Sequence, residues 1–161
     1  MPNWISQWLK ENFLKEKITN NKKNIKKIYL DRSNKSSHHP PLRSIANEDE
    51  VKQHLLKNNF ISIKLHETKF TEQVELFNNA ECIIGLHGGG FANLAFCKPG
   101  TKVIELRSSN AGTPIENLAK KNKLNYSSII FEAKQIYKFD YPNQQGSIQV
   151  PISSLIKVLE N

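Results

Sequence analysis

The spacing of apolar residues changes along the chain, and these changes predict an order of helices and strands. Between residues 3 and 18, tryptophan, isoleucine, leucine and phenylalanine recur at intervals of three and four, which is typical of an amphipathic helix. Short apolar or alternating runs, each too short for a helix, predict strands at 27–31, 60–65, 82–86, 102–106 and 125–131. Further helices are predicted at 47–57, 71–77, 114–121 and 152–159.

Alternation of strands with helices predicts an α/β fold with right-handed crossovers and a mostly parallel, Rossmann-like sheet flanked by helices. We expect two regions: residues 1–24, an amphipathic helix with a basic linker, and residues 25–161, the Rossmann-like domain. Asn47 precedes three acidic residues and is expected to cap a helix. The turn-rich segment Phe139–Gly146 is expected to form a surface hairpin.

Backbone freedom is concentrated after one predicted strand. Four of the seven glycines lie between Gly85 and Gly90, where the strand 82–86 runs into His87 and three consecutive glycines. An apolar spacing suited to a helix resumes at Phe91. A strand, a glycine turn and a helix start place unpaired backbone N–H groups around an anion. On this pattern alone, an ordinary tight turn with a surface histidine is an equal alternative.

Charge and composition narrow the class of protein. The chain carries 23 Lys and Arg against 15 Asp and Glu, a formal charge of +8, and residues 1–27 hold seven lysines against two glutamates. The sequence has neither an arginine cluster nor alternating basic and aromatic residues, so binding of nucleic acid is not expected. The lysine-rich segment is then a solvated surface or a contact for anionic lipid. Cys82 and Cys97 are expected to be reduced core residues. We expect a cytoplasmic protein, with peripheral contact to the inner face of the membrane as an option.

The arginines are few and their positions are informative. Arg32 and Arg107 follow predicted strands, and Arg43 lies in the long loop between, which also contains the pair His38–His39. A guanidinium grips a phosphate at two points, although structural salt bridges are the alternative. Ligands of parallel sheets bind beyond the carboxyl ends of the strands, so we expect Arg32, His87 and Arg107 at one rim, around a diphosphate. The histidine pair has no third ligand at a recognisable spacing and is expected to be solvated.

Short motifs in a fixed order resemble glycosyltransferase family 61, which includes bacterial capsular polysaccharide biosynthesis proteins. The resemblance covers residues 26–132 approximately, and its motifs are Tyr29–Arg32, Arg43–Glu48, Phe70–Val74, Gly85–Asn93, Phe96 with Pro99–Thr101, and Val103–Glu105. In the glycine turn, this chain has His-Gly-Gly-Gly-Phe where the family more often has an alanine and a leucine. The resemblance implies a GT-B architecture of two Rossmann-like lobes, of which this chain corresponds to the C-terminal one.

The chemistry implied by the resemblance is transfer from a nucleotide sugar, often a UDP sugar, to a glycan acceptor. The transfer is expected to invert the anomeric centre, to need no metal or other cofactor, and to serve surface polysaccharide biosynthesis. The absence of an Asp-x-Asp motif agrees with metal independence. An N-terminal GT-B lobe is an expected partner. Residues carried over to donor binding are Arg32, Arg43, His87, Gly88, Gly89, Gly90, Asn93 and Glu105.

Each carried-over residue has an implied role. Arg32 and Arg43 neutralise the departing diphosphate, and the amides of Gly88–Gly90 with the helix behind them add stabilisation. His87 donates to a phosphate or a sugar hydroxyl. Glu105, taken to end its strand, accepts the ribose hydroxyls or else forms a buried salt bridge.

The remaining candidates are less specific. Asn93 contacts the donor or caps the turn, and Gln73 and Asn47 are expected to be architectural. An inverting transfer needs a base for the acceptor hydroxyl, and the nearby carboxylates are Glu48 and Asp31. The base is otherwise supplied by another lobe, so Glu48 and His87 are retained only as catalytic candidates.

Two other functions compete with transfer. One is a non-catalytic module that binds a nucleotide or a phosphate and docks on a partner or a membrane through its basic N-terminus. The other is a hydrolase that uses His87, which is disfavoured because the chain has no Gly-x-Ser-x-Gly nucleophile elbow.

Overall fold

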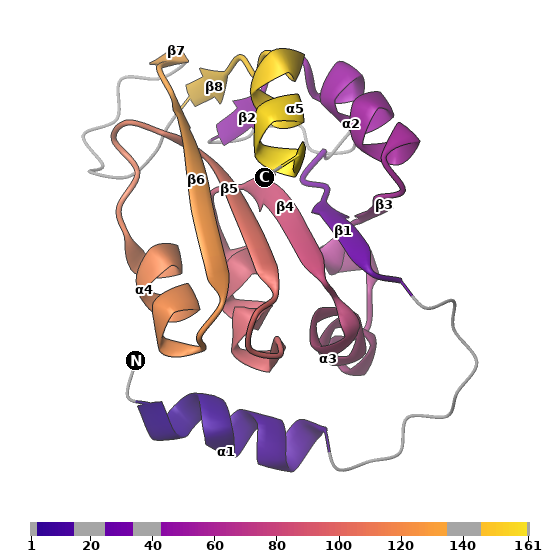
Figure 1. The fold of residues 1–161 in the computed structure, drawn as a ribbon, viewed down its shortest axis with the longest axis vertical. Helices are drawn as coiled ribbons and strands as arrows, with labels where there is room; N and C mark the ends of the chain where they lie inside the picture. The colour runs from indigo at the N-terminus through magenta and orange to yellow at the C-terminus, as the bar shows by residue number, and fades with distance from the viewer. Residues whose placement is uncertain (1–2, 15–24, 34–42, 135–145, 161) are drawn as a thin grey trace.

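The computed structural model describes residues 3–14, 25–33, 43–134 and 146–160. Its centre is a five-stranded sheet with the order β3-β1-β4-β5-β6, in which every pair of neighbours is parallel (Figure 1). The strands are β1 (Lys27–Leu30), β3 (Ile61–Ile63), β4 (Cys82–Leu86), β5 (Lys102–Ser108) and β6 (Asn125–Phe131). The expected α/β fold with a parallel, Rossmann-like sheet is confirmed.

Helices cover both faces of this sheet, and each face has its own apolar core. On one face, α3 (Phe70–Asn79), the 3-10 helix η2 (Gly89–Phe96) and α4 (Pro114–Lys121) pack against the side chains of Ile83 and Val103. On the other face, α2 (Glu48–Lys57) and α5 (Ile152–Glu160) pack against Ile84 and Ile104. Consecutive residues of a strand point to opposite faces, which is why a run such as Cys-Ile-Ile is apolar throughout.

A second, three-stranded sheet was not predicted. It consists of β2 (Arg43–Ile45), β8 (Gly146–Ile148) and β7 (Ala133–Lys134) in the order β2-β8-β7, with β2 parallel and β7 antiparallel to β8. Arg43, expected in a loop, is therefore the first residue of a strand. Strands of two or three residues are too short for a sequence pattern, and β2 and β8 pair across a hundred residues of chain. Apart from Gly146, the expected hairpin at 139–146 lies outside the described residues, as does the pair His38–His39.

Several predicted boundaries differ from the structure. The strand expected at 60–65 is shorter, and a 3-10 turn, η1 (Leu65–Glu67), follows it. β5 continues to Ser108, so Glu105 lies inside the strand and does not end it. The helix after the glycine turn is 3-10 and not α-helical. Asn47 precedes α2, but its side chain makes no capping bond; it donates to Val150 O (2.8 Å) and accepts from Val150 N (3.0 Å).

The N-terminal helix α1 (Asn3–Phe13) packs beside η2, at the amino end of the sheet strands (Figure 1). Lys10 Nζ donates to Cys97 O at 2.6 Å, and the ring of Phe13 meets those of Phe70 and Phe96 edge to face, with centroids 5.2 and 6.3 Å apart. Residues 15–18, the rest of the predicted helix, lie outside the described part. The division of the chain at residue 24 stays a prediction. Within the described ranges, no helix combines the length and the apolar character needed to cross a bilayer.

Candidate functional site

The order of the strands defines a topological switch point at the carboxyl edge of the sheet. From β1 the chain passes outward to β3 and then returns to β4 on the other side of β1. The loops that follow β1 and β4 therefore diverge, and open α/β sheets bind their ligands at this switch point. Arg32 lies two residues beyond the end of β1, and His87 directly follows β4.

Two guanidinium groups meet at His87. Arg32 Nη1 donates to the main-chain oxygen of His87 at 2.8 Å, and Arg43 Nη1 approaches the same oxygen at 3.4 Å. Arg43 reaches this point from β2, in the small sheet. The structure thus brings together three of the residues that the sequence assigned to the diphosphate.

The two arginines are placed where their charges are not fully balanced. Burial, and then the positive charge of Arg43, lower the pKa of Arg32, while the nearby Glu48 carboxylate opposes this effect. Burial also lowers the pKa of Arg43, whose Nε is buried without a hydrogen-bond partner among the described residues. Like charges held together in a partly buried place repel each other, so a bound anion would stabilise them. This arrangement favours an anion site.

Gly88 makes room for the Arg32 side chain. A Cβ added at Gly88 would lie 1.9 Å from Arg32 Nη1, and the residue has a φ of +154°, which L side chains rarely adopt. A Cβ at Gly89 would meet nothing within 4 Å, and one at Gly90 would lie 2.9 Å from Leu65 Cδ1. Since the first N–H groups of any helix lack intrahelical partners, the start of η2 still offers donors at this edge, although it is a 3-10 and not an α-helical N-terminus.

Behind the glycine turn, His87 belongs to a buried polar chain. His87 Nδ1 contacts Glu105 Oε1, and Tyr126 Oη donates to Glu105 Oε2. The Glu105 side chain has no exposed surface, and that of His87 is only 7% exposed. Glu105 therefore has buried polar partners, and its contact with His87 is an ion pair when the histidine is protonated, whereas the binding of ribose by Glu105 stays a prediction. Because the Glu105 side chain is fully buried, a contact with ribose would require a rearrangement of the residues around it.

The two carboxylates considered as bases have opposite environments. Burial raises the pKa of Glu48, and the Asp31 charge adds to this, although hydrogen bonds from Tyr29 Oη (2.9 Å) and the Arg32 backbone oppose it. Burial would also raise the pKa of Asp31, but hydrogen bonds from Lys52, Ser33 and Ser62 outweigh it and lower the pKa to about 2. Glu48 is therefore the better proton acceptor of the two.

Asn93 and Gln73 form a structural connection between helices. Asn93 Nδ2 donates to Gln73 Oε1 at 2.8 Å, and Gln73 Nε2 donates to the carbonyls of Leu65 and Thr68 at 2.8 and 2.9 Å. The expected architectural role of Gln73 is confirmed. The role of Asn93 in donor binding stays a prediction.

Arg107 does not join the group at the His87 carbonyl. It lies inside β5, is buried, and donates through Nη2 to Ala111 O four residues later. The expectation that Arg107 follows its strand was wrong, because β5 is two residues longer than the apolar run that predicted it.

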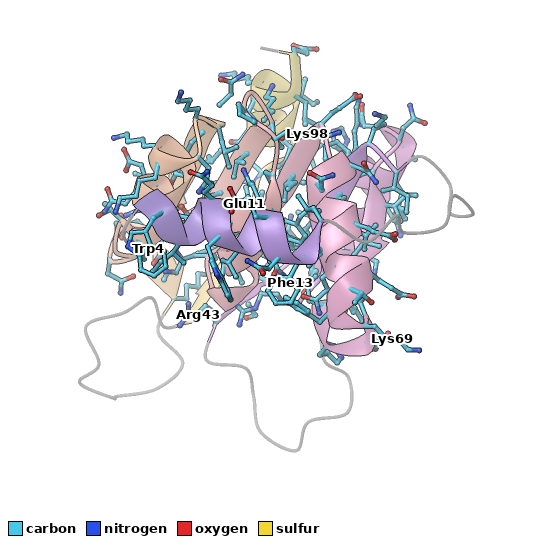
Figure 2. All side chains as sticks on the ribbon, turned by 90° about the horizontal axis from the view of Figure 1, so that it is seen from below. Trp4, Glu11, Phe13, Arg43, Lys69 and Lys98 are labelled. Atoms are coloured by element: carbon cyan, nitrogen blue, oxygen red, sulfur yellow. The ribbon has the colours of Figure 1, made fainter. Side chains whose placement is uncertain are left out.

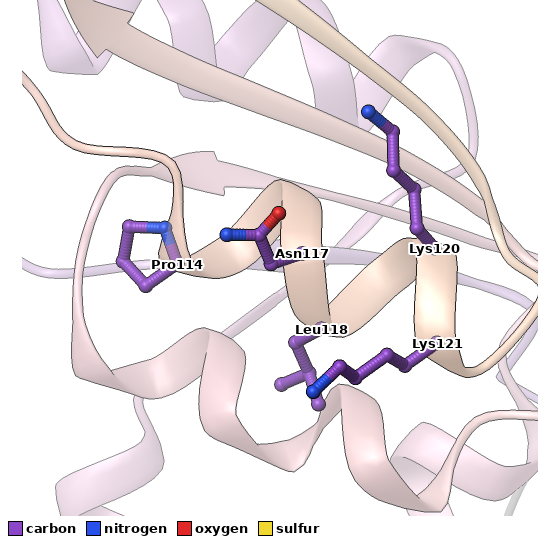
Figure 3. Close-up of a pocket in the computed structure, with 5 residues that line it drawn as sticks. All are labelled: Pro114, Asn117, Leu118, Lys120 and Lys121. Atoms are coloured by element: carbon purple, nitrogen blue, oxygen red, sulfur yellow. The ribbon is translucent and has the colours of Figure 1, made fainter. Parts of the chain in front are cut away.

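Other features of the described residues do not coincide with this site. A surface hollow of about 540 Å³ lies along α4 and is lined by Pro114, Asn117, Leu118, Lys120 and Lys121 (Figure 3). Cys82 and Cys97 are buried free thiols, as expected, and burial raises their pKa to about 11 and about 12. Among the residues that the structure describes, no three His, Cys, Asp or Glu side chains are grouped as metal ligands.

Sequence reasoning missed the hydroxyl partners of the two key carboxylates. Tyr29 Oη bonds to Glu48, and Tyr126 Oη bonds to Glu105. Tyr29 belongs to a motif that the sequence had marked, so its position was a usable signal. Tyr126 sits in an ordinary strand pattern, and nothing local distinguishes it from a core tyrosine.

Comparison with known sequences shows which family the chain belongs to. No curated protein sequence matches the chain at a significant level. A family model described as Glycosyltransferase 61 matches residues 1–104, a segment that begins before α1 and ends within β5. The match thus starts earlier and ends earlier than the resemblance expected at 26–132, and it includes Arg32, Arg43, Glu48, His87 and the glycine turn. Since it covers more than half of the 161 residues, the chain belongs to the glycosyltransferase 61 family.

Proposed function

We propose that this glycosyltransferase chain binds the diphosphate of a nucleotide sugar, UDP-linked, beyond the carboxyl ends of β1 and β4 and transfers the sugar to a glycan acceptor. The observation that carries the proposal is the convergence of Arg32 and Arg43 on the His87 carbonyl at a topological switch point. We place the reaction in surface polysaccharide biosynthesis, on the resemblance described above.

The arginines supply charge where the leaving group develops it. As the bond from the anomeric carbon to the diphosphate oxygen breaks, negative charge grows on that oxygen. The guanidinium groups of Arg32 and Arg43 and the N–H groups of Gly88, Gly89 and Gly90 stabilise it. Fixed cations perform the task that a divalent ion performs elsewhere, which supports a metal-independent reaction. The lack of an Asp-x-Asp motif in the sequence supports it as well.

Glu48 is the base that we propose for the acceptor. Its carboxylate takes the proton of the acceptor hydroxyl while that oxygen bonds to the anomeric carbon from the side opposite the diphosphate, so the anomeric centre inverts. The raised pKa of Glu48 supports this role. In a GT-B arrangement, the facing N-terminal lobe would bring the acceptor to this edge.

A thermal-shift panel of UDP, GDP and UDP-sugars, each with and without EDTA, tests the proposal. UDP is expected to raise the melting temperature equally in both conditions. Arg32→Ala is expected to abolish the shift and to remain folded, whereas Lys69→Ala, which removes an exposed cation, keeps it. A panel without any shift, or an unchanged shift in Arg32→Ala, would contradict the proposed site. A shift that EDTA removes would contradict metal independence.

A non-catalytic binding module docked on a membrane is the second candidate. The outward face of α1 supports the docking part, since Trp4 and Trp8 are 65% and 50% exposed and residues 1–27 carry a net positive charge. Such a protein would lie on the cytoplasmic side of the membrane, where anionic lipids concentrate. Release or transfer of the sugar by a chain that binds UDP-sugar separates an enzyme from this module.

A further inference from the structure

Asp31 is a buried carboxylate that directly precedes Arg32, and its side chain is only 1% exposed. Ser33 donates to Oδ1 through its main-chain N–H at 2.8 Å and through its hydroxyl at 2.6 Å. Ser62 Oγ donates to Oδ2 at 2.9 Å, and Lys52 Nζ bonds the same oxygen. Because Ser62 lies in β3 and Lys52 in α2, the carboxylate joins the chain beyond β1 to a neighbouring strand and a helix.

The bond from Ser33 N to Asp31 Oδ1 closes a turn around Arg32. An aspartate side chain that accepts from the N–H two residues later restricts the dihedral angles of the residue between them. The Asp31 main chain is held as well, since its N–H donates to Ile63 O at 2.9 Å. The Arg32 main chain also bonds the Glu48 carboxylate. The backbone at Arg32 is therefore fixed from both sides.

The guanidinium of Arg32 requires such a fixed backbone. Nη1 donates to His87 O at 2.8 Å, and it lies so close to Gly88 that a Cβ added there would be 1.9 Å away. A side chain that reaches its site from a loop is placed only as precisely as the loop itself. β1 ends at Leu30, so strand pairing does not hold Arg32, and the Asp31 carboxylate does.

The charge of Asp31 makes its place informative. Its hydrogen bonds outweigh burial and lower its pKa to about 2, so the carboxylate is ionised at neutral pH. A buried charge is a poor means of stabilising a fold, because well-packed apolar residues often stabilise it as much. By charge alone, a carboxylate next to Arg32 would also weaken the binding of an anion. The position that it gives to Arg32 explains its presence better than either effect.

We propose that Asp31 is a positioning residue for the donor diphosphate: its carboxylate fixes the main chain at Arg32 and so places the guanidinium at the His87 carbonyl. The identity of the ligand rests on the proposed function, whereas the placement of Arg32 does not. Asp31 then affects an anion in two opposite ways, unfavourably through its charge and favourably through Arg32. We expect the second effect to be the larger.

Side-chain NMR of the 15N-labelled arginines tests the placement of Arg32 in the free protein. The chain has three arginines, so Arg32→Lys assigns the Arg32 signal by its loss, and the buried Arg107 is the internal control. The guanidinium protons of Arg32 are expected to exchange slowly with water in the wild type and in Asp31→Asn, whose amide oxygen still accepts from Ser33 N. In Asp31→Ala they should exchange rapidly, while those of Arg107 do not change.

Two outcomes of this measurement would overturn the inference. One is equal exchange of the Arg32 protons in the wild type and Asp31→Ala. The other is rapid exchange in Asp31→Asn, because the charge and not the bond to Ser33 would then be the relevant feature. If Asp31→Ala does not fold, Asp31→Leu, which leaves no cavity, takes its place in the comparison.

Calorimetric titration with UDP provides the functional readout. Asp31→Ala is expected to bind UDP about tenfold more weakly than the wild type, the equivalent of one hydrogen bond to a charged group, and Asp31→Asn within about twofold of the wild type. Asp49→Ala, which removes an exposed carboxylate from α2, controls for the change in net charge.

The direction of the change in Asp31→Ala separates the possible roles. Tighter binding of UDP would mean that Asp31 acts only through its charge, and an unchanged affinity in a less stable variant would mean a merely structural role. Either result would contradict the inference. If the wild type does not bind UDP, the proposed function fails, and the exchange of the Arg32 protons still decides the inference.

Discussion

At the scale of single residues, Gly88 determines where the Arg32 guanidinium lies. Its missing side chain leaves the space that Nη1 occupies, 1.9 Å from the position of a Cβ. Gly88→Ala is therefore expected to displace Arg32, to abolish the UDP shift, and to lower the free energy of unfolding by about 1–3 kcal/mol because the backbone is strained. Thermal or urea unfolding and the nucleotide panel measure both effects.

Gly89→Ala is the matched control for that change. It introduces the same methyl group one residue later, into open space. Its stability should be close to that of the wild type. A stable Gly88→Ala variant that still binds UDP would show that neither the turn nor the Arg32 position matters to the ligand.

Glu48 and its raised pKa lead to a prediction about rate. Glu48→Gln keeps the shape and the contact with Tyr29 but cannot accept a proton, so we expect kcat to fall by about 10²–10⁴-fold with donor binding retained. In the wild type, activity should decline on acidification at a pH above the ordinary carboxyl pKa of 4.5. Asp49→Asn, an exposed change in the same helix turn, is the control. An active Glu48→Gln enzyme would assign the base to another lobe.

Asp31 leads to a prediction about acid stability. Its folded pKa of about 2 lies below the ordinary value of 3.8, so its contribution is present above the unfolded pKa and is lost as pH falls through the folded value. Asp31→Asn is expected to lower the free energy of unfolding at pH 7 by about 2 kcal/mol and to flatten its decline between about pH 4 and pH 2. Urea unfolding across this range measures the change. If the free energy of unfolding fell equally between pH 4 and pH 2 in the variant and the wild type, the lowered pKa of Asp31 would be contradicted.

At the scale of elements, α1 has a buried face and an aromatic outward face. Its inner side packs on η2, while Trp4 and Trp8, one turn apart, remain exposed. Figure 2 shows Trp4 and Phe13 near opposite ends of the helix, with Lys69 just before the start of the neighbouring α3. Amphipathic aromatic rings with nearby cations are typical of helices that lie in a membrane interface.

Co-sedimentation with vesicles tests this face of α1. The wild type is expected to bind vesicles that contain phosphatidylserine and to bind purely zwitterionic vesicles weakly. The double variant Trp4→Ala, Trp8→Ala should lose most of this binding without a change in melting temperature, because neither indole is buried. Leu56→Ala, which removes an exposed apolar side chain from α2, is the control. Undiminished binding by the double variant would exclude α1 as the docking element.

At the scale of the whole molecule, the function depends on strands that are distant in sequence. Arg32 follows β1, Arg43 begins β2, and His87 follows β4. Only the assembled sheets bring the two guanidinium groups within hydrogen-bond distance of the His87 main-chain oxygen. The site therefore exists only in the folded protein. A ligand that bridges these elements stabilises the entire fold, by about 2.7 kcal/mol at a hundred times its dissociation constant.

Much of the fold could be predicted because its pattern is local. The parallel sheet, the α4 helix at 114–121 and the strands at 82–86 and 125–131 follow from apolar spacing and from turn residues, which each act over a few positions. The small sheet could not be predicted in this way. Its strands of two or three residues carry no period, and β2 and β8 are joined by contacts between residues 43–45 and 146–148.

The candidate site, like the fold, could be predicted from the sequence only in part. The sequence by itself determined the α/β fold, the glycine turn, and the choice of Arg32 and His87 as groups at the carboxyl edge, because each follows from residue type next to a strand end. A family resemblance, and no local pattern, had assigned Arg43 to the same group. Tertiary structure alone decided that Arg107 does not join it and that Glu105 is paired with His87 and Tyr126. The physical reason is that strand register and burial set side-chain contacts, and both arise from pairing between segments that no local pattern connects.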